Sequence, residues 1–263
     1  MGALKTIKAI VSDMDGVLWR GDQVLPGMVD LFQFLRARHI PFVLATNNSG
    51  RHTSNYIEKL AGMGVPNITA QQLVSSATAT ADYLKNRYPN GARLFVIGNP
   101  GLFQTLEEAD FTITAEAVDA VVVGLDFEFT YQKAREATLL IRNHGATFIG
   151  TNPDTSFPAP EGLVPGAGSV IHMIQQASGV EPTIIGKPAR AMFEVALQRL
   201  GTSPQETLMI GDRLNTDIEG AYHAGLQTAF VLTGVNQRAD IGAIQPDYIF
   251  DSLPDLLSAW RDA

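Results

Sequence analysis

Residues 8–17 read KAIVSDMDGV, an apolar run that ends in two aspartates, Asp13 and Asp15, with a glycine directly after them. The apolar part is typical of a buried strand, and the carboxyl ends of such strands are where open α/β sheets bind their ligands. Two carboxylates this close repel each other, so the site requires a cation or a shared proton. The stretch indicates a chemical site, although aspartates at such positions also serve as ordinary helix or turn caps.

Apolar, β-branched runs alternate with amphipathic stretches along the chain. We expect strands at residues 7–12, 42–46, 94–98, 120–125, 147–150, 183–186, 207–211, 228–232 and 247–250. Helical spacing of apolar residues marks 28–38, 131–144, 189–200 and 216–224. This alternation predicts an α/β fold, a doubly wound and mostly parallel sheet with helices on both faces.

Four candidate groups, Asp13, Thr46, Lys187 and Asp212, each stand at or just after the end of an expected strand. Because the carboxyl ends of parallel strands share one edge of a sheet, we expect these groups to meet in one crevice. The middle of the chain has strands and helices of its own but none of the four groups. We therefore predict a core domain at 1–79 and 181–263, with a second α/β domain inserted at 80–180.

The net charge and the absence of cysteine limit the kinds of molecule that this protein is expected to bind. The 263 residues carry 19 basic and 27 acidic side chains, for a net charge of −8, and no cysteine. We therefore expect no general binding to nucleic acid or anionic membrane, and the absent cysteines exclude disulfides and Cys-ligated zinc. Since there is no secretory leader and no apolar run of membrane-spanning length, we expect a cytoplasmic protein.

The types of residue at the strand ends suit phosphoryl chemistry. A carboxylate such as Asp13, next to a cation, can attack phosphorus, and Asp15 can give a proton to the leaving alcohol and later take one from water. Residues 44–50, LATNNSG, offer hydroxyl, amide and backbone groups for phosphate oxygens, but they also fit an ordinary capped turn. Lys187 could pair with Asp13 and a phosphoryl group, or it could be a solvated loop lysine.

A further pair of acids, Asp212 and Asp217, flanks a turn after the run 207–211. Together with Asp13 they could supply carboxylate oxygens to a hard cation, and Mg²⁺ suits such a set best. Helix capping is the alternative role for Asp217.

The four motifs taken together, DMDGV at 13–17, Thr46-Asn47, Gly186-Lys187-Pro188 and Gly211-Asp212 with Asp217, resemble those of the haloacid dehalogenase superfamily. The stretches 150–154, 164–169 and 185–188 resemble the NagD-type and 4-nitrophenyl phosphatases, which have a large α/β cap between the second and third motifs. The resemblance implies a Rossmann-like core with an inserted cap, and it extends over nearly the whole chain.

The resemblance also implies roles for individual residues. Asp13 is expected to be the nucleophile and, with Asp212 and the backbone carbonyl of Asp15, a Mg²⁺ ligand. Asp15 is expected to act as acid and base, and Asp217 to orient a metal-bound water or Lys187.

The other expected contacts concern the substrate. By resemblance, Thr46, Asn47 and Asn48 hold the phosphoryl group and Lys187 neutralises it. A cap loop that includes Asn152, Asp154 and Phe157 is expected to face the substrate. Phe157 stands where pyridoxal phosphatases have a histidine, so we expect it either to cover an apolar leaving group or to pack inside the cap.

The function predicted from these motifs is Mg²⁺-dependent hydrolysis of small phosphate monoesters through an aspartyl-phosphate intermediate, with a small phosphorylated metabolite as substrate. The alternatives are transfer to another alcohol, as in a mutase, and a non-catalytic sensor of phosphometabolites. A phosphorylated receiver module is a poorer fit because such modules are about half this length. Relatives with caps of this type also suggest a homodimer formed through the cap.

Overall fold

The protein, seen in a computed structural model, is described over residues 3–159 and 162–261. It forms two compact units. The first comprises Met1–Thr46, Ile57–Val74 and Lys187–Ala263, and the second comprises Asn47–Tyr56 and Ser75–Gly186. The boundary within the N-terminal part of the chain falls inside a helix, α2 (Thr53–Gly62).

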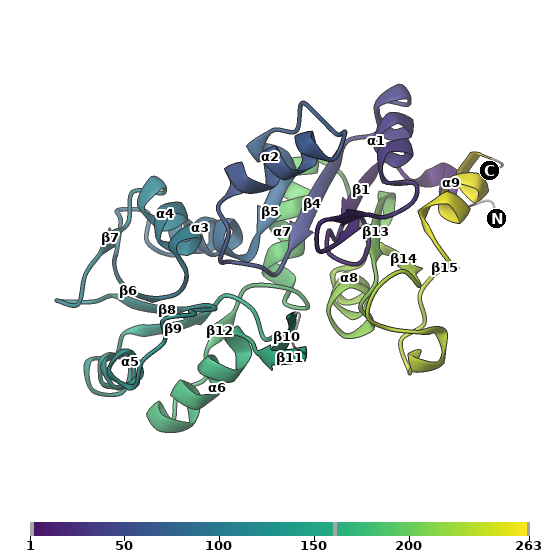
Figure 1. Cartoon of the computed structure of the whole chain (residues 1–263). Coiled ribbons are helices and arrows are strands. Elements are labelled where there is room, and N and C mark those ends of the chain that lie inside the picture. Colours follow the sequence, from purple (N-terminus) through teal and green to yellow (C-terminus); the bar gives the residue numbers. More distant parts are fainter. Residues whose placement is uncertain (1–2, 160–161, 262–263) are drawn as a thin grey trace. The chain divides into compact units, whose positions relative to one another are not determined.

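The first unit is built on a six-stranded sheet in the order β15-β14-β13-β1-β4-β5 (Figure 1). The pairings that join β15, β14, β13, β1 and β4 are all parallel. Every residue of β1, β4 and β13 is buried, as expected for strands with both faces covered. The strands are β1 (Ala9–Ser12), β4 (Phe42–Thr46), β5 (Leu73–Ser75), β13 (Thr207–Gly211), β14 (Gln227–Val231) and β15 (Tyr248–Phe250).

The helices of this unit turn apolar stripes toward the sheet. In α1 (Met28–Ala37) the buried residues are Met28, Leu31, Phe32, Phe34 and Leu35, which follow helical spacing. A two-stranded hairpin, β2 (Trp19–Arg20) with β3 (Gln23–Val24), lies between β1 and α1 in the chain. The remaining elements are α7 (Arg190–Leu200), α8 (Glu219–Ala224), α9 (Leu253–Arg261), a π-helical turn (Leu214–Ile218) and 3-10 turns at Ala3–Thr6, Ala70–Gln72, Pro204–Glu206 and Arg238–Asp240.

The second unit has its own five-stranded sheet, in the order β12-β9-β8-β6-β7, with parallel pairing throughout. A cluster of buried side chains that includes Val121, Phe148, Leu140 and Ile171 joins this sheet to α5 and α6. The strands of this sheet are β6 (Arg93–Ile97), β7 (Thr112–Ile113), β8 (Ala120–Val123), β9 (Thr147–Gly150) and β12 (Thr183–Ile184). The helices are α3 (Ser76–Arg87), α4 (Pro100–Glu108), α5 (Tyr131–His144) and α6 (Ala167–Ser178). A separate hairpin is formed by β10 (Ser156–Ala159) and β11 (Gly162–Pro165).

The predicted α/β class and parallel sheet are confirmed. One expectation about the strands is wrong, because 183–186 does not belong to the sheet that carries Asp13. Its strand, β12, pairs with β9 of the second unit, with Thr183 opposite Ile149. The sequence of a short β-branched run does not specify which strand it pairs with, so the sheet to which 183–186 belongs could not be predicted. The predicted boundary at residue 80 falls inside α3, and the predicted helix at 216–224 begins as the π-helical turn.

Across the described ranges, no helix combines the length and the apolar character that crossing a bilayer would require.

Candidate active site

The carboxylates of Asp13 and Asp212 are brought together by the pairing of β1 with β13. Ser12 lies opposite Ile210 in this parallel ladder, and the backbone N–H of Asp13 extends it by donating to the carbonyl of Ile210 at 2.8 Å. Asp13 and Asp212 therefore follow the carboxyl ends of β1 and β13 side by side, at the same edge of the sheet. Both side chains are buried, with Asp13 7% and Asp212 0% exposed.

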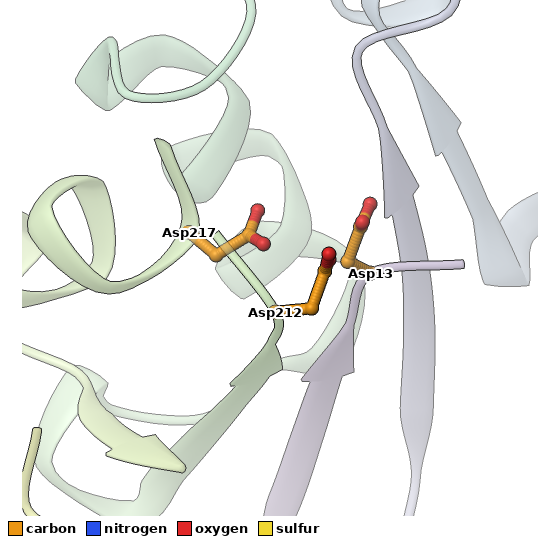
Figure 2. A group of neighbouring side chains, drawn as sticks. All are labelled: Asp13, Asp212 and Asp217. Carbon is orange, nitrogen blue, oxygen red and sulfur yellow. The ribbon is translucent and has the colours of Figure 1, made fainter. Parts of the chain in front are cut away.

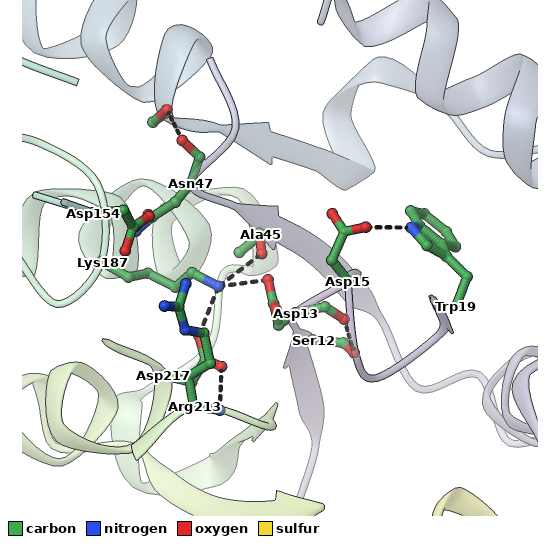
Figure 3. A network of polar contacts seen from close by, with 11 residues as sticks. Ser12, Asp13, Asp15, Trp19, Ala45, Asn47, Asp154, Lys187, Arg213 and Asp217 are labelled. Carbon is green, nitrogen blue, oxygen red and sulfur yellow. Dashed lines mark hydrogen bonds and ion pairs between the residues drawn. The ribbon is translucent and has the colours of Figure 1, made fainter. Parts of the chain in front are cut away.

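The ammonium of Lys187 lies in the middle of this group. Its Nζ is 2.6 Å from Asp13 Oδ1 and 2.7 Å from Asp217 Oδ1, and it also donates to the backbone carbonyl of Ala45 at 3.1 Å (Figure 3). Only 2% of Lys187 is exposed. Burial lowers the pKa of Lys187, but the carboxylates of Asp13 and Asp217 outweigh it and hold the pKa above its ordinary value. The lysine therefore stays charged, and the solvated-loop alternative is wrong.

Negative charge still exceeds positive charge at this edge of the sheet. Burial raises the pKa of Asp13 well above its ordinary value against the opposing effect of Lys187, and the neighbouring Asp217 and Asp212 raise it further. Burial, followed by the charge of Asp217, raises the pKa of Asp212 to about 7, while the backbone N–H of Val235 and Lys187 act in the opposite direction. The pKa values of both aspartates stay raised despite these opposing effects, which for Asp212 include the guanidinium of Arg213, so a further cation would favour the ionised carboxylates.

The same three carboxylates fit a metal ion. Asp13, Asp212 and Asp217 each offer an oxygen within 4.8 Å of the others. Figure 2 shows the three side chains as neighbours. Asp212 Oδ1 is buried and has no hydrogen-bond partner within 3–159 and 162–261, whereas Asp212 Oδ2 accepts from the backbone N–H of Val235 at 2.8 Å. A buried carboxylate oxygen without a donor is costly unless a cation binds it. An all-oxygen set of this kind suits Mg²⁺.

Two glycines make room for Asp212. A Cβ on Gly16 would lie 2.5 Å from Asp212 Oδ2, and a Cβ on Gly234 would lie 1.8 Å from the same atom. Gly16 also has a φ of +86°, which other L residues rarely adopt. Glycine at position 16 of the motif is therefore required both because a Cβ would collide with Asp212 and because the backbone has a positive φ.

The carboxylate of Asp15 lies outside this group. It is exposed, and its Oδ1 accepts a hydrogen bond from Trp19 Nε1 at 2.8 Å. Figure 3 shows Asp13 turned toward Lys187 and Asp15 turned toward Trp19. The two aspartates of the motif thus have separate surroundings, one buried and ion-paired and the other accessible to water, and this matches the separate roles predicted for them.

Of the residues predicted to hold phosphate, Thr46 is buried at the end of β4 in the first unit, whereas Asn47 and Asn48 belong to the second unit. Asn48 Oδ1 accepts from the backbone N–H of Gly50 at 2.8 Å, which is the capped-turn geometry. Asn47 Nδ2 donates to Asp154 Oδ2 at 3.0 Å.

The predicted cap residues fall into two groups within the second unit. Asn152 is buried, and its Nδ2 donates to the backbone carbonyl of Asn47 at 2.8 Å, so it lies with Asp154 around Asn47. Phe157 is half-buried in the β10–β11 hairpin, and its ring lies 6.1 Å from the ring of Phe127, measured between centroids. Because Phe127 is 73% exposed, Phe157 packs in an apolar surface cluster rather than in the interior of the unit.

Sequence reasoning missed the backbone partners of the site. The carbonyl of Ala45 and the N–H of Val235 are contacts that any residue type could make, so no sequence signal marks them. The hydrogen bond from the indole of Trp19 to Asp15 was not predicted either, because a spacing of four residues does not show that the chain turns back between them.

Comparison with known proteins agrees with this geometry. Residues 10–112 match the family described as haloacid dehalogenase-like hydrolase, and residues 184–256 match a family described as HAD-hydrolase-like. The chain is 38% identical over 258 residues to an acid sugar phosphatase of Staphylococcus aureus, an alignment that covers 97% of this chain and 98% of that protein.

Solved structures show the same relationship. A 4-nitrophenylphosphatase from Thermotoga maritima matches with a TM-score of 0.93 and 33% identity, covering 99% of this chain and 100% of that one. NagD from Escherichia coli K-12 matches with a TM-score of 0.87 and 32% identity, covering 94% and 97%. The chain belongs to the haloacid dehalogenase-like hydrolases, and its predicted resemblance to NagD-type members is confirmed.

The raised pKa of Asp212 predicts how stability depends on pH in metal-free protein. The folded state keeps a proton that the unfolded state releases, so the free energy of unfolding should fall as pH rises from about 4 to about 7. Asp212→Asn, which cannot ionise, should show a flatter profile in EDTA. Mg²⁺ should raise the melting temperature of the unmodified protein most at the upper end of this range, because it binds the ionised carboxylates. Parallel pH profiles for the two proteins, together with no effect of Mg²⁺, would contradict the assignment.

Replacing the central ammonium should be costly. Lys187→Met keeps an unbranched side chain one atom shorter but leaves Asp13 and Asp217 buried without their cation, so the free energy of unfolding should fall by about 3–5 kcal/mol near neutral pH. Urea unfolding measures this loss. Lys8→Met is the matched control, because the ion pair of Lys8 with Glu206 is at the surface, where solvent screens it, and its loss should change the free energy of unfolding little. Equal losses in the two variants would show that Lys187 does not compensate the buried charges.

Proposed function

We propose that this chain is a phosphatase that hydrolyses small phosphate monoesters through an aspartyl-phosphate formed on Asp13. The observation that carries the proposal is the buried Asp13–Lys187 pair, 2.6 Å apart, at the end of β1 and next to Asp212 and Asp217. The names of the relatives support the same reaction class, since they describe a sugar phosphatase and a 4-nitrophenylphosphatase.

In the first step proposed here, a carboxylate oxygen of Asp13 attacks phosphorus and the bond from phosphorus to the ester oxygen breaks. Asp15 gives a proton to the departing alcohol. In the second step Asp15 takes a proton from water, the water oxygen attacks phosphorus, and the Asp13 carboxylate is released with inorganic phosphate. The positions of the two aspartates suit this division, because Asp13 is ion-paired and Asp15 is open to solvent.

Charge on the phosphoryl group needs compensation during transfer. Lys187 is already oriented by Asp13, Asp217 and the carbonyl of Ala45, so it can stabilise developing charge without having to reorganise. Mg²⁺ would be held by Asp13, Asp212 and Asp217, with the backbone carbonyl of Asp15 as a further proposed ligand. When bound it would offset negative charge on the phosphoryl oxygens.

The remaining binding groups are assigned by the same proposal. Thr46, Asn47 and Asn48 hold the phosphoryl oxygens through hydroxyl, amide or backbone groups. Asn47 is supported by Asn152 and Asp154, which bind its carbonyl and its amide within the second unit. We propose that the inserted domain is a cap that selects the leaving group and that Phe157 contacts it. The predicted pairing of caps into a homodimer is tested by measuring the mass of the protein in solution.

The nucleophile assignment predicts the effect of Asp13→Asn. An amide at this position is a poor nucleophile, so turnover of any phosphate ester should fall by a factor on the order of 10⁴ or more. Release of inorganic phosphate from 4-nitrophenyl phosphate in the presence of Mg²⁺ measures this, and Asp30→Asn on the exposed face of α1 is the matched control. Substantial turnover by Asp13→Asn would refute the mechanism. Product analysis with added alcohols measures how much phosphoryl group passes to an alcohol instead of water.

The cap assignment predicts a selective effect of Phe157→Ala. If the ring contacts an aromatic leaving group, KM for 4-nitrophenyl phosphate should rise about 3- to 10-fold while KM for a small alkyl phosphate changes little. Steady-state kinetics on both esters measures the difference. Tyr131→Ala, which removes an exposed ring from the start of α5, should change neither constant. An equal change for the two esters would remove Phe157 from the specificity site.

A further inference from the structure

The carboxylate of Asp15 has one oxygen anchored and the other open. Trp19 Nε1 donates to Asp15 Oδ1 at 2.8 Å, and no hydrogen bond to Asp15 Oδ2 is found among the described residues. An exposed aspartate normally samples several rotamers, and a fixed hydrogen bond to one oxygen reduces that freedom. The anchored geometry leaves Asp15 Oδ2 for the proton.

Trp19 is itself held firmly, although it lies in a short hairpin. Only 1% of it is exposed, and its backbone is part of a tight turn in which the N–H groups of Leu18 and Trp19 both donate to the carbonyl of Met14. The N–H of Gly16 donates back to the carbonyl of Trp19 at 2.8 Å. The indole therefore reaches Asp15 from a hydrogen-bonded turn that is formed by residues 14–19, within and directly after the motif.

Lys59, on α2, contacts the same hairpin at the Trp19 ring and at the turn. Lys59 Nζ, on α2, lies 4.6 Å from the centroid of the Trp19 ring, close enough for a cation–π interaction. The same ammonium donates to the carbonyl of Gly21 at 2.7 Å and lies 3.7 Å from Asp22 Oδ1. Lys59 thus ties the ring and the turn of the hairpin to α2, and all of these residues belong to the first unit.

We infer that Trp19 is a positioning residue for the proton transfer of Asp15, and that Lys59 supports it through the indole ring. The inference rests on the proposed function, because it gives Asp15 the acid and base role. Trp19 needs no contact with the substrate to do this. By fixing one oxygen of the carboxylate, it keeps the other oriented for the leaving alcohol at the moment the ester bond breaks.

Such a role has a kinetic signature that depends on the leaving group. An alkyl alcohol leaves poorly unless it is protonated, whereas 4-nitrophenolate is stable as an anion and leaves without a proton. The ratio kcat/KM reports only the steps up to the first irreversible one, here phosphoryl transfer to Asp13. Loss of a well-oriented Asp15 should therefore reduce kcat/KM for an alkyl phosphate more than for 4-nitrophenyl phosphate.

The experiment compares Trp19→Phe with the unmodified protein on glycerol 2-phosphate and 4-nitrophenyl phosphate, in Mg²⁺. We expect kcat/KM to fall about tenfold more on the alkyl ester than on the aryl ester. Asp15→Asn should show the same selectivity to a greater extent. Trp260→Phe is the matched control, because it makes the same change at the other tryptophan of the chain, which is also buried, and should leave both values unchanged.

An equal loss on both esters, or no loss, in a Trp19→Phe protein that melts cooperatively would overturn the inference. If that variant does not fold, Lys59→Met decides the question, since it removes the ammonium above the ring and keeps the apolar stem. It should shift the ratio in the same direction by a smaller factor, and an unchanged ratio would overturn the inference. Failure of the proposed function is a different result, in which the unmodified protein hydrolyses neither ester.

Discussion

The balance of charge around Lys187 is the constraint on which the rest of the site depends. Three carboxylates are buried at the end of a parallel sheet, and one ammonium lies within ion-pair distance of two of them. Burying charge is costly unless each charge has a partner, and here Lys187 is 174 positions along the chain from one of its two partners, Asp13. The arrangement therefore forms only when the chain is folded, and its three carboxylate oxygens are close enough to hold a hard, oxygen-binding cation.

The backbone decides which side chains share this charge. The register of β1 against β13 puts Asp13 beside Asp212, and Gly16 and Gly234 leave the space that the Asp212 carboxylate occupies. The first aspartate of the motif is buried and ion-paired, and the second is exposed and accepts a hydrogen bond from the buried indole of Trp19. Two identical side chains two residues apart thus have different surroundings, and their proposed roles as nucleophile and proton carrier need such a difference.

The boundary between the two units falls within the segment that is predicted to bind phosphate, between Thr46 and Asn47. Thr46 ends a strand of the first unit, whereas Asn47 is held by Asn152 and Asp154 of the second. Both of these partners follow β9, at the carboxyl end of a parallel sheet, where open α/β domains present their polar groups. Asn47, which is predicted to hold the phosphoryl group, is thus linked by hydrogen bonds within one compact unit to Asn152 and Asp154, which are predicted to face the substrate.

The sequence by itself determined the α/β class, the main strands and the identity of the charged residues, because apolar periodicity and strand-end acids are local signals. It could not determine that β12 joins the second sheet, since strand pairing is a choice among distant partners. Nor could it show that Lys187 is buried between Asp13 and Asp217, or that Trp19 holds Asp15. Only the tertiary structure decided these points, because distance, burial and pKa depend on atoms that the chain brings together on folding.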